Sequence, residues 1–179
     1  TPGKHQYVCC NDFASLYPST IITCNLSFEN FMGDNFTEDE INAFKLDKNY
    51  FVSVTGQVYK NDKDYAFKVI QSTLKSNRNT SKYLAKGLEA EVVYDIDNIL
   101  KGHDVTLRNY SADKIKAIKE IGYDVTCTSD LYNIADLTLF KNKLRTEIEF
   151  YTSYEQAMKL LGNSMYGGSS HISCFWYNM

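Results

Sequence analysis

The chain has 179 residues and a formal net charge of −3, with 44% hydrophobic and 23% charged residues. This length and composition are typical of one globular domain or of part of a larger one. The negative net charge argues against a general nucleic-acid coat protein, and no apolar run is long enough to span a bilayer.

The five cysteines form no C-x-x-C pair, which argues against a zinc site or a disulfide framework and favours a reducing compartment. We therefore expect a cytoplasmic location (the host cytoplasm if the protein is viral) and no membrane partner. The chain begins with Thr1 rather than Met and ends at Met179 without a helix-ending signal. We interpret it as a fragment.

A strand, a turn and a helix are predicted at the start of the chain. Residues 7–10 (Tyr-Val-Cys-Cys) favour a short buried strand, and Pro18 suits the first turn of a helix. Asp12 then lies between them, beside unpaired backbone N–H groups. A carboxylate in that place suits a hard cation, and the N–H groups suit phosphate oxygens. The plainer interpretation is a structural corner with a solvated aspartate.

Residues 25–60 predict a loop, a short helix and a β-hairpin in that order. We expect a loop over residues 25–35. Thr37 and Glu40 form a capping box, which predicts a helix through about Phe44. Two apolar-rich runs, residues 50–54 and 57–60, flank Thr-Gly, which is typical of a hairpin.

A helix is predicted from Ala66 to about Val93, and its first part is basic. No acidic residue lies between Tyr65 and Leu88. Four cations recur at intervals of three, four and four, so they form one stripe along the helix, made of Lys75, Arg78, Lys82 and Lys86. This stripe either meets an anion or is simply a solvated face, which is the usual explanation of a charge run.

The rest of the chain predicts a helical hairpin with a shorter helix near its tip. Ser111 opens that short helix and Gly122 closes it, and we identify no site between residues 95 and 130. A long helix is expected from about Leu131 to Met165, antiparallel to the first, with one apolar face made of Leu137, Phe140, Leu144, Ile148 and Tyr151. The predicted fold class is therefore α+β, with a strand and a β-hairpin near the start of the chain and a long antiparallel helical hairpin.

Two motifs resemble those of the family B (DNA polymerase alpha-like) DNA polymerases, phage type. Residues 12–19 match motif A, Asp-x-x-Ser-Leu-Tyr-Pro-Ser, and residues 159–167 match motif B, Lys-x-x-x-Asn-Ser-x-Tyr-Gly. Lys159, Asn163 and Tyr166 share one helix face, so they can address one ligand. The plainer interpretation of the second motif is an amphipathic helix that stops at Gly167-Gly168.

The resemblance implies a DNA-directed DNA polymerase and gives roles to its residues. Asp12 would bridge two Mg²⁺ ions (Mn²⁺ is an alternative), and the Phe13 backbone carbonyl would bind one of them. The triphosphate would be held by the backbone N–H groups of Ala14, Ser15 and Leu16 and by the side chains of Arg78, Lys82, Lys159 and Asn163. Tyr17 would lie under the deoxyribose and exclude a 2′-hydroxyl, unless it is a core residue, and Tyr166 and Gly167 would line the nascent base pair.

The same resemblance implies an arrangement of domains and partners. Residues 1–64 would start the palm, 65–158 would form the fingers, and 159–179 would carry motif B back towards the palm. Partners would be primer–template DNA, deoxynucleoside triphosphates and the remainder of the polymerase, with a sliding clamp as a further candidate. Motif C, which supplies the second metal carboxylate, is absent from the chain. Two alternatives therefore stay open: one subunit of a split polymerase, and a non-catalytic nucleic-acid-binding relic.

Overall fold

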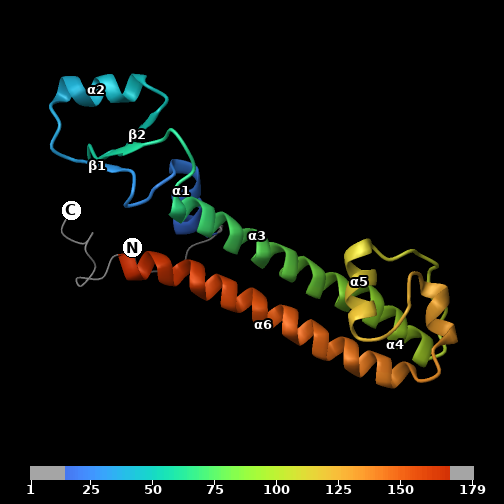
Figure 1. Ribbon diagram of the computed structural model, residues 1–179. Helices are drawn as coiled ribbons and strands as arrows, with labels where there is room; N and C mark the ends of the chain where they lie inside the picture. The colour runs from blue at the N-terminus through green and yellow to red at the C-terminus, as the bar shows by residue number, and fades with distance from the viewer. Residues whose placement is uncertain (1–14, 170–179) are drawn as a thin grey trace, which may run out of the picture. The chain divides into compact units, whose positions relative to one another are not determined.

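The computed structural model describes residues 15–169, which divide into two compact units. Among these residues, the first unit comprises 15–72 and 163–169, and the second comprises 73–162. The described part is mostly helical with a three-stranded antiparallel sheet, so the predicted α+β class is confirmed (Figure 1). The strand expected at residues 7–10 lies outside the described residues.

The helix predicted around Pro18 is α1 (Leu16–Cys24), and Pro18 lies buried in its first turn. Both ends of α1 are left-handed: Ser15 precedes it with φ 54°, and Asn25 caps its end with φ 53°. Asparagine tolerates this conformation better than most residues. The chain therefore turns sharply on either side of α1.

The sheet contains the predicted hairpin and one strand that the sequence did not indicate. Strands β2 (Tyr50–Val52) and β3 (Val58–Lys60) pair across the Thr-Gly turn, where Gly56 has a φ of 87°. Strand β1 (Phe31–Gly33) pairs with the other side of β3, in the segment that we expected to be a loop. Three residues with a bulge are too short to show an alternating pattern, which explains the error.

Helix α2 (Glu38–Leu46) begins at the predicted capping box. The Thr37 hydroxyl accepts from the Glu40 backbone N–H at 3.4 Å, and the Glu40 carboxylate accepts from the Thr37 backbone N–H at 2.8 Å. The pKa of Glu40 is lowered, chiefly by that backbone hydrogen bond. Aromatic contacts hold the helix against its neighbours, since the Phe44 ring contacts those of Phe36 and Tyr50.

Two buried asparagines tie α1 to the sheet and to the segment before the next helix. The Asn25 amide donates to the carbonyl of Lys63 at 2.7 Å and accepts from the Tyr65 N–H at 3.3 Å. The Asn30 amide donates to the carbonyls of Asn25 and Lys60, at 2.7 and 2.6 Å. Both side chains are about 97% buried or more, so these contacts satisfy groups that have no access to water.

Replacing Asn30 by leucine should destabilise the first unit by about 2–4 kcal/mol. The substitution removes three hydrogen bonds, including one accepted from the Ser27 N–H, and leaves buried backbone groups without partners. Urea denaturation would measure the loss. Asn35→Leu, at an exposed position in the same unit, is the control, and an equal loss in both variants would contradict the network.

The helical segment that begins at Ala66 is longer and less regular than predicted. It runs as α3 (Ala66–Gly87), continues as a π-helical stretch, η1 (Leu88–Val93), and ends as α4 (Tyr94–Leu100). A π-helix has an extra residue in each turn. The neighbours Val92 and Val93 are therefore both buried, at 0% and 2% exposure, together with Leu88.

The hairpin of the second unit is closed by α5 (Ala112–Glu120), η2 (Thr128–Asn133, a 3₁₀ helix) and α6 (Leu137–Ser169). Helix α5 begins after Ser111 and ends before Gly122, whose φ is 88°, as predicted. The long helix begins at Leu137 rather than at about Leu131, because residues 128–133 form the separate 3₁₀ turn. Hydrogen bonds from Thr126 and Cys127 lower the pKa of Asp130, which caps that turn, to about 2.

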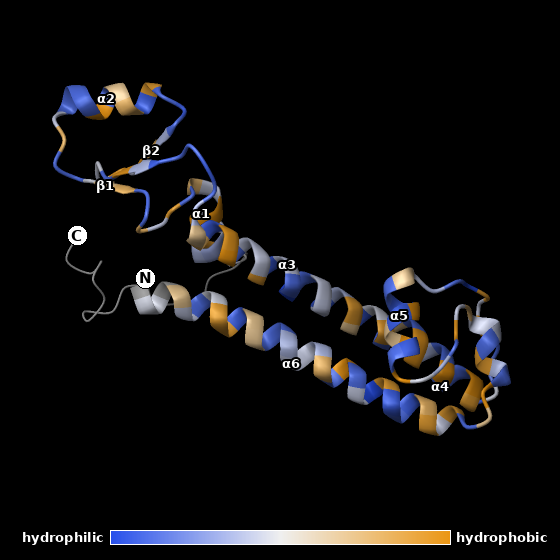
Figure 2. Cartoon of the chain, viewed as in Figure 1, coloured by the Kyte–Doolittle hydropathy of each residue, from blue (hydrophilic) through white to orange (hydrophobic). Residues whose placement is uncertain are grey.

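The apolar face predicted for α6 builds the core of the second unit. Phe140 and Leu144 are fully buried, and Leu137, Ile148 and Tyr151 pack partly buried against the same cluster. Figure 2 shows hydrophobic residues gathered where α4, α5 and the start of α6 meet. Two ion pairs show that α6 runs antiparallel to the segment from α3 to α4. Arg78 of α3 pairs with Glu155, in the second half of α6, and Asp97 of α4 pairs with Lys141, near its start.

A fully buried carboxylate sits inside this core. Asp95 accepts from an Arg108 nitrogen at 2.8 Å and from the Tyr110 hydroxyl at 2.9 Å. Burial, followed by the hydrogen bond and charge of Asp95, raises the pKa of Tyr110. Tyr110 therefore stays a hydrogen-bond donor across the physiological pH range.

Arg108→Met should destabilise the second unit by about 2 kcal/mol, because it leaves the Asp95 carboxylate buried without its cation. Fully buried pairs lose about 3–5 kcal/mol in this way, and the Arg108 side chain is 34% exposed, which reduces the loss. The double variant Arg108→Met/Asp95→Leu should recover part of the stability in urea denaturation. A double variant less stable than Arg108→Met would contradict this account.

Candidate nucleotide-binding site

The structure describes motif A only from Ser15 onward. Asp12, Phe13 and Ala14 lie outside the described residues, so their assignments to metal and phosphate remain predictions. Within residues 15–169 no group of three or more histidine, cysteine or acidic side chains is placed to hold a metal ion.

The start of α1 presents a helix N-terminus without acidic side chains. The carbonyl of Ser15 accepts from the Ser19 N–H at 2.9 Å, while the Ser15 side chain makes no capping hydrogen bond. The first turn contains no acidic residue. An anion at this end would benefit from the helix dipole and meet no competing carboxylate within the helix.

Leu16 and Tyr17 are half exposed in that first turn, at 49% and 51%. Tyr17 is thus only half covered in the described structure, and its assignment to the sugar stays a prediction. Pro18 and Ile21 are the buried residues of α1.

Arg78 on α3 is engaged with a carboxylate that the sequence did not reveal. Its Nε donates to Glu155 Oε1 at 2.7 Å, and the two side chains are only 22% and 16% exposed. Glu155 lies one helical turn before Lys159. Its place beside a predicted site residue was the signal that the sequence offered for a role of Glu155 in the site. The pairing became visible only once the antiparallel alignment of α3 and α6 was known.

Lys82 lies one turn after Arg78 and is exposed, as is Lys86 one turn further on. Lys75, at the other end of the stripe, is half buried. The basic stripe is therefore a continuous surface feature of α3, but its arginine already has an anionic partner.

Motif B lies near the end of α6, on one uninterrupted helix. Lys159 and Asn163 are exposed and one turn apart, so they share a helix face. Gly167 and Gly168 are inside α6, which is described as far as Ser169, so the glycine stop of the plainer interpretation is not seen at this pair. The side chain of Tyr166 is not among those described.

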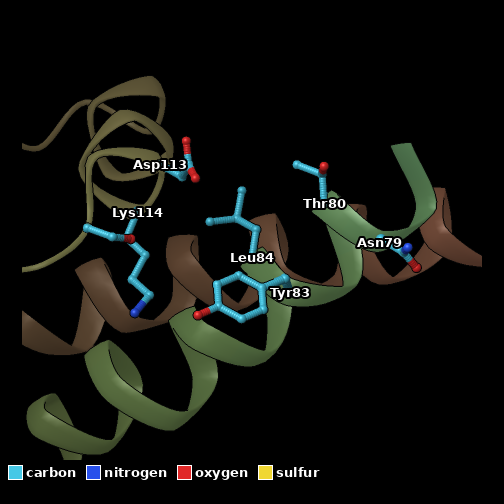
Figure 3. A pocket seen from close by; sticks show the side chains of 7 residues that line it. Asn79, Thr80, Tyr83, Leu84, Asp113 and Lys114 are labelled. Carbon is cyan, nitrogen blue, oxygen red and sulfur yellow. The ribbon is translucent and has the colours of Figure 1, made fainter. Parts of the chain in front are cut away.

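A hollow that the sequence analysis missed lies in the second unit, between α3 and the start of α5. Its volume is about 350 Å³, and Figure 3 shows its side chains; it is lined by Asn79, Thr80, Tyr83, Leu84, Ser111, Asp113 and Lys114. We had expected no site between residues 95 and 130, and three of the lining residues fall there. The only signal in the sequence was a tyrosine among the lysines of α3.

No helix within residues 15–169 combines the length and the apolar character needed to cross a membrane. Among known families, the one described as DNA polymerase family B matches residues 4–96 of the chain. That range contains motif A, Arg78 and Lys82, and it ends before motif B. Neither the curated proteins nor the solved structures contain a match to the chain.

Proposed function

The chain belongs to DNA polymerase family B, and from this premise we propose that it forms the nucleotide-binding part of a site that adds deoxynucleotides to a primer 3′-hydroxyl. The observation that carries the proposal is the family match itself, because it spans Asp12, Tyr17, Arg78 and Lys82 together. Motif B, outside the match, adds Lys159 and Asn163 on one exposed helix face.

The proposed metal ligands fit the ion that such chemistry uses. The Asp12 carboxylate and the Phe13 carbonyl offer hard oxygen donors, as Mg²⁺ requires, and Mn²⁺ accepts the same set. When bound, two such ions stabilise the attacking and leaving oxygens of a phosphoryl transfer. Asp12 would hold both ions, and a second carboxylate would come from the part of the polymerase that carries motif C.

The chain's own residues would bind and orient the nucleotide. The N-terminus of α1 would receive the β- and γ-phosphates at the N–H groups of Ala14, Ser15 and Leu16. Tyr17, half exposed beside them, would lie against the sugar and collide with a 2′-hydroxyl. Tyr166 and Gly167 would border the nascent base pair.

Arg78 would exchange its partner when a nucleotide binds. In the described structure its guanidinium is held by Glu155, and a triphosphate would offer phosphate oxygens for the same planar fork. Lys82 and Lys159 would add charge opposite the leaving phosphates. Such an exchange couples closure of a fingers domain to nucleotide binding.

We assign residues 1–64 to the start of a palm, 65–158 to fingers, and 159–179 to motif B and the return. The compact unit of residues 73–162 supports a separate fingers body. By this assignment the partners are primer–template DNA, deoxynucleoside triphosphates and the rest of the polymerase.

Primer extension by the full-length protein tests the proposal. With Mg²⁺, a labelled primer–template and four deoxynucleotides, we expect extension that depends on the metal. Extension only after a second protein carrying motif C is added would identify a split enzyme. No extension under either condition, with retained DNA binding, would favour the non-catalytic relic and overturn the proposal.

Arg78→Ala should raise the nucleotide KM about 10-fold or more while primer–template affinity changes little, because a charged hydrogen bond contributes about 1.5–3 kcal/mol. Steady-state kinetics and a DNA-binding titration would measure the two effects. Glu155→Gln is the matched control, since it also breaks the ion pair but keeps the guanidinium. Equal KM increases in both variants would mean that Arg78 acts through the helix pairing and not on the nucleotide.

Tyr17→Ala should increase ribonucleotide incorporation relative to deoxynucleotide incorporation by about 10- to 100-fold, since a steric block in a site distinguishes substrates by about 1–3 kcal/mol. The ratio of kcat/KM values for a matched pair of nucleotides measures it. Leu16→Ala, equally exposed next to it, should leave the ratio unchanged. Unchanged discrimination in Tyr17→Ala would remove the sugar-contact role.

A further inference from the structure

The hollow between α3 and α5 has the features of a site for a planar, weakly polar group. Its inner wall is Leu84, which is 9% exposed, and at its rim stands Tyr83, whose side chain is 76% exposed. Asn79, Thr80 and Ser111 add hydrogen-bonding groups around the opening. Its volume of about 350 Å³ is at the small end of ligand pockets, and it suits one base better than a whole nucleotide chain.

The charges inside the hollow do not favour a phosphate there. The Lys114 side chain is 7% exposed, and its ammonium pairs with Glu91 Oε1 at 2.5 Å. A Cβ placed on Gly87 would lie 2.7 Å from Lys114 Cε, so the glycine makes room for this buried stem. With Lys114 already paired, the remaining charged lining group is the Asp113 carboxylate, which repels phosphate and accepts from N–H donors.

A basic edge runs beside the hollow on the same helix. At about 100° per residue, Lys86 and Lys82 lie about 60° and 100° around α3 from Tyr83, on the side opposite Thr80 and Leu84. Both lysines are exposed, and the described residues provide neither with an ion pair. The helix thus presents an aromatic ring with an apolar hollow on one side and positive charge on the other.

We propose that this surface binds single-stranded DNA, with one base stacked on the Tyr83 ring in the hollow and the adjoining phosphate on Lys86. Aromatic rings next to a positive edge are the elements by which proteins hold single strands. Asn79 and Asp113 are among the lining residues and offer polar groups to the edge of the base. The choice of DNA as the strand rests on the proposed polymerase function. The surface shares α3 with Arg78 and Lys82, two residues assigned to the triphosphate.

The test is a binding titration with the full-length protein and a single-stranded oligothymidylate that contains one 2-aminopurine, in EDTA and without nucleotide. We expect binding that quenches the 2-aminopurine fluorescence. Tyr83→Ala should weaken binding about 5- to 100-fold and abolish the quenching, because stacking is lost. Tyr83→Phe should retain both, and Tyr132→Ala, which removes another exposed tyrosine (56% exposed, in η2), is the control.

The salt dependence tests the phosphate contact separately. Lys86→Gln should reduce the slope of log K against log salt by about 0.7, the value for one phosphate of a single strand. Full affinity and quenching in Tyr83→Ala would overturn the proposal, as would losses of equal size in Tyr83→Ala and Tyr132→Ala. Since no metal or nucleotide is present, failure here leaves primer extension untouched, and failure of extension leaves this binding untouched.

Discussion

Asp12→Asn should lower the rate of nucleotide incorporation by at least about 10³-fold in the full-length protein while primer–template affinity changes less than about 3-fold. Removing a single group that stabilises developing charge in a transition state costs about 10²–10³ in kcat. The carboxylate at position 12 is proposed to hold both ions, so its loss should cost no less. Single-turnover extension measures the rate, and titration of labelled primer–template measures the affinity.

The control for this substitution is Asp34→Asn, which removes an exposed carboxylate from the same compact unit. It should retain the full rate. If Asp12→Asn keeps more than about a tenth of the rate, the metal assignment is wrong, even though the chain remains a family member. If it loses DNA binding in parallel with the rate, Asp12 has a structural role at the start of α1.

The parts of the fold that the sequence predicted are those with a local physical cause. The capping box at Thr37 and Glu40 depends on neighbours in one turn, and the β2–β3 hairpin depends on a glycine that accepts a φ of 87°. The apolar face of α6 follows from helical periodicity alone. Each of these features is decided by residues within a few positions of one another.

The parts that the sequence missed depend on residues far apart in the chain. Strand β1 exists because β3 provides its hydrogen-bond partners. Its own three residues favour no particular secondary structure. The polar network around Asn30 joins three segments, and the pair between Arg78 and Glu155 spans 77 positions. No local pattern identifies such partners.

The candidate site likewise has features that the sequence predicted and features that it missed. The resemblance of two motifs implied which side chains could serve a nucleotide, and those assignments stay predictions, while the family itself is matched over residues 4–96. Sequence reasoning did not anticipate that Arg78 already has a partly buried partner, because the identity of Glu155 as its neighbour required the antiparallel pairing. The hollow at Tyr83 was missed for the same reason, since its two walls come from α3 and α5.

Phe140→Ala should be the most destabilising single substitution in the second unit, by about 3–5 kcal/mol. Phe140 is fully buried in the core cluster, and its ring lies 4.4 Å from that of Tyr123 between centroids. Truncation removes the buried ring and leaves a cavity that the helices around it can close only in part. Urea denaturation followed by circular dichroism at 222 nm would measure the change in the free energy of unfolding.

Leu139→Ala is the matched control, because the neighbouring side chain, about 100° around α6 from Phe140, is 48% exposed and its truncation should cost less than about 1 kcal/mol. Losses of similar size in the two variants would mean that α6 does not pack through the face described. The expected difference also separates stability from function. If Phe140→Ala weakens single-strand binding only at urea concentrations that unfold the helices, then the core supports the surface at Tyr83 without taking part in it.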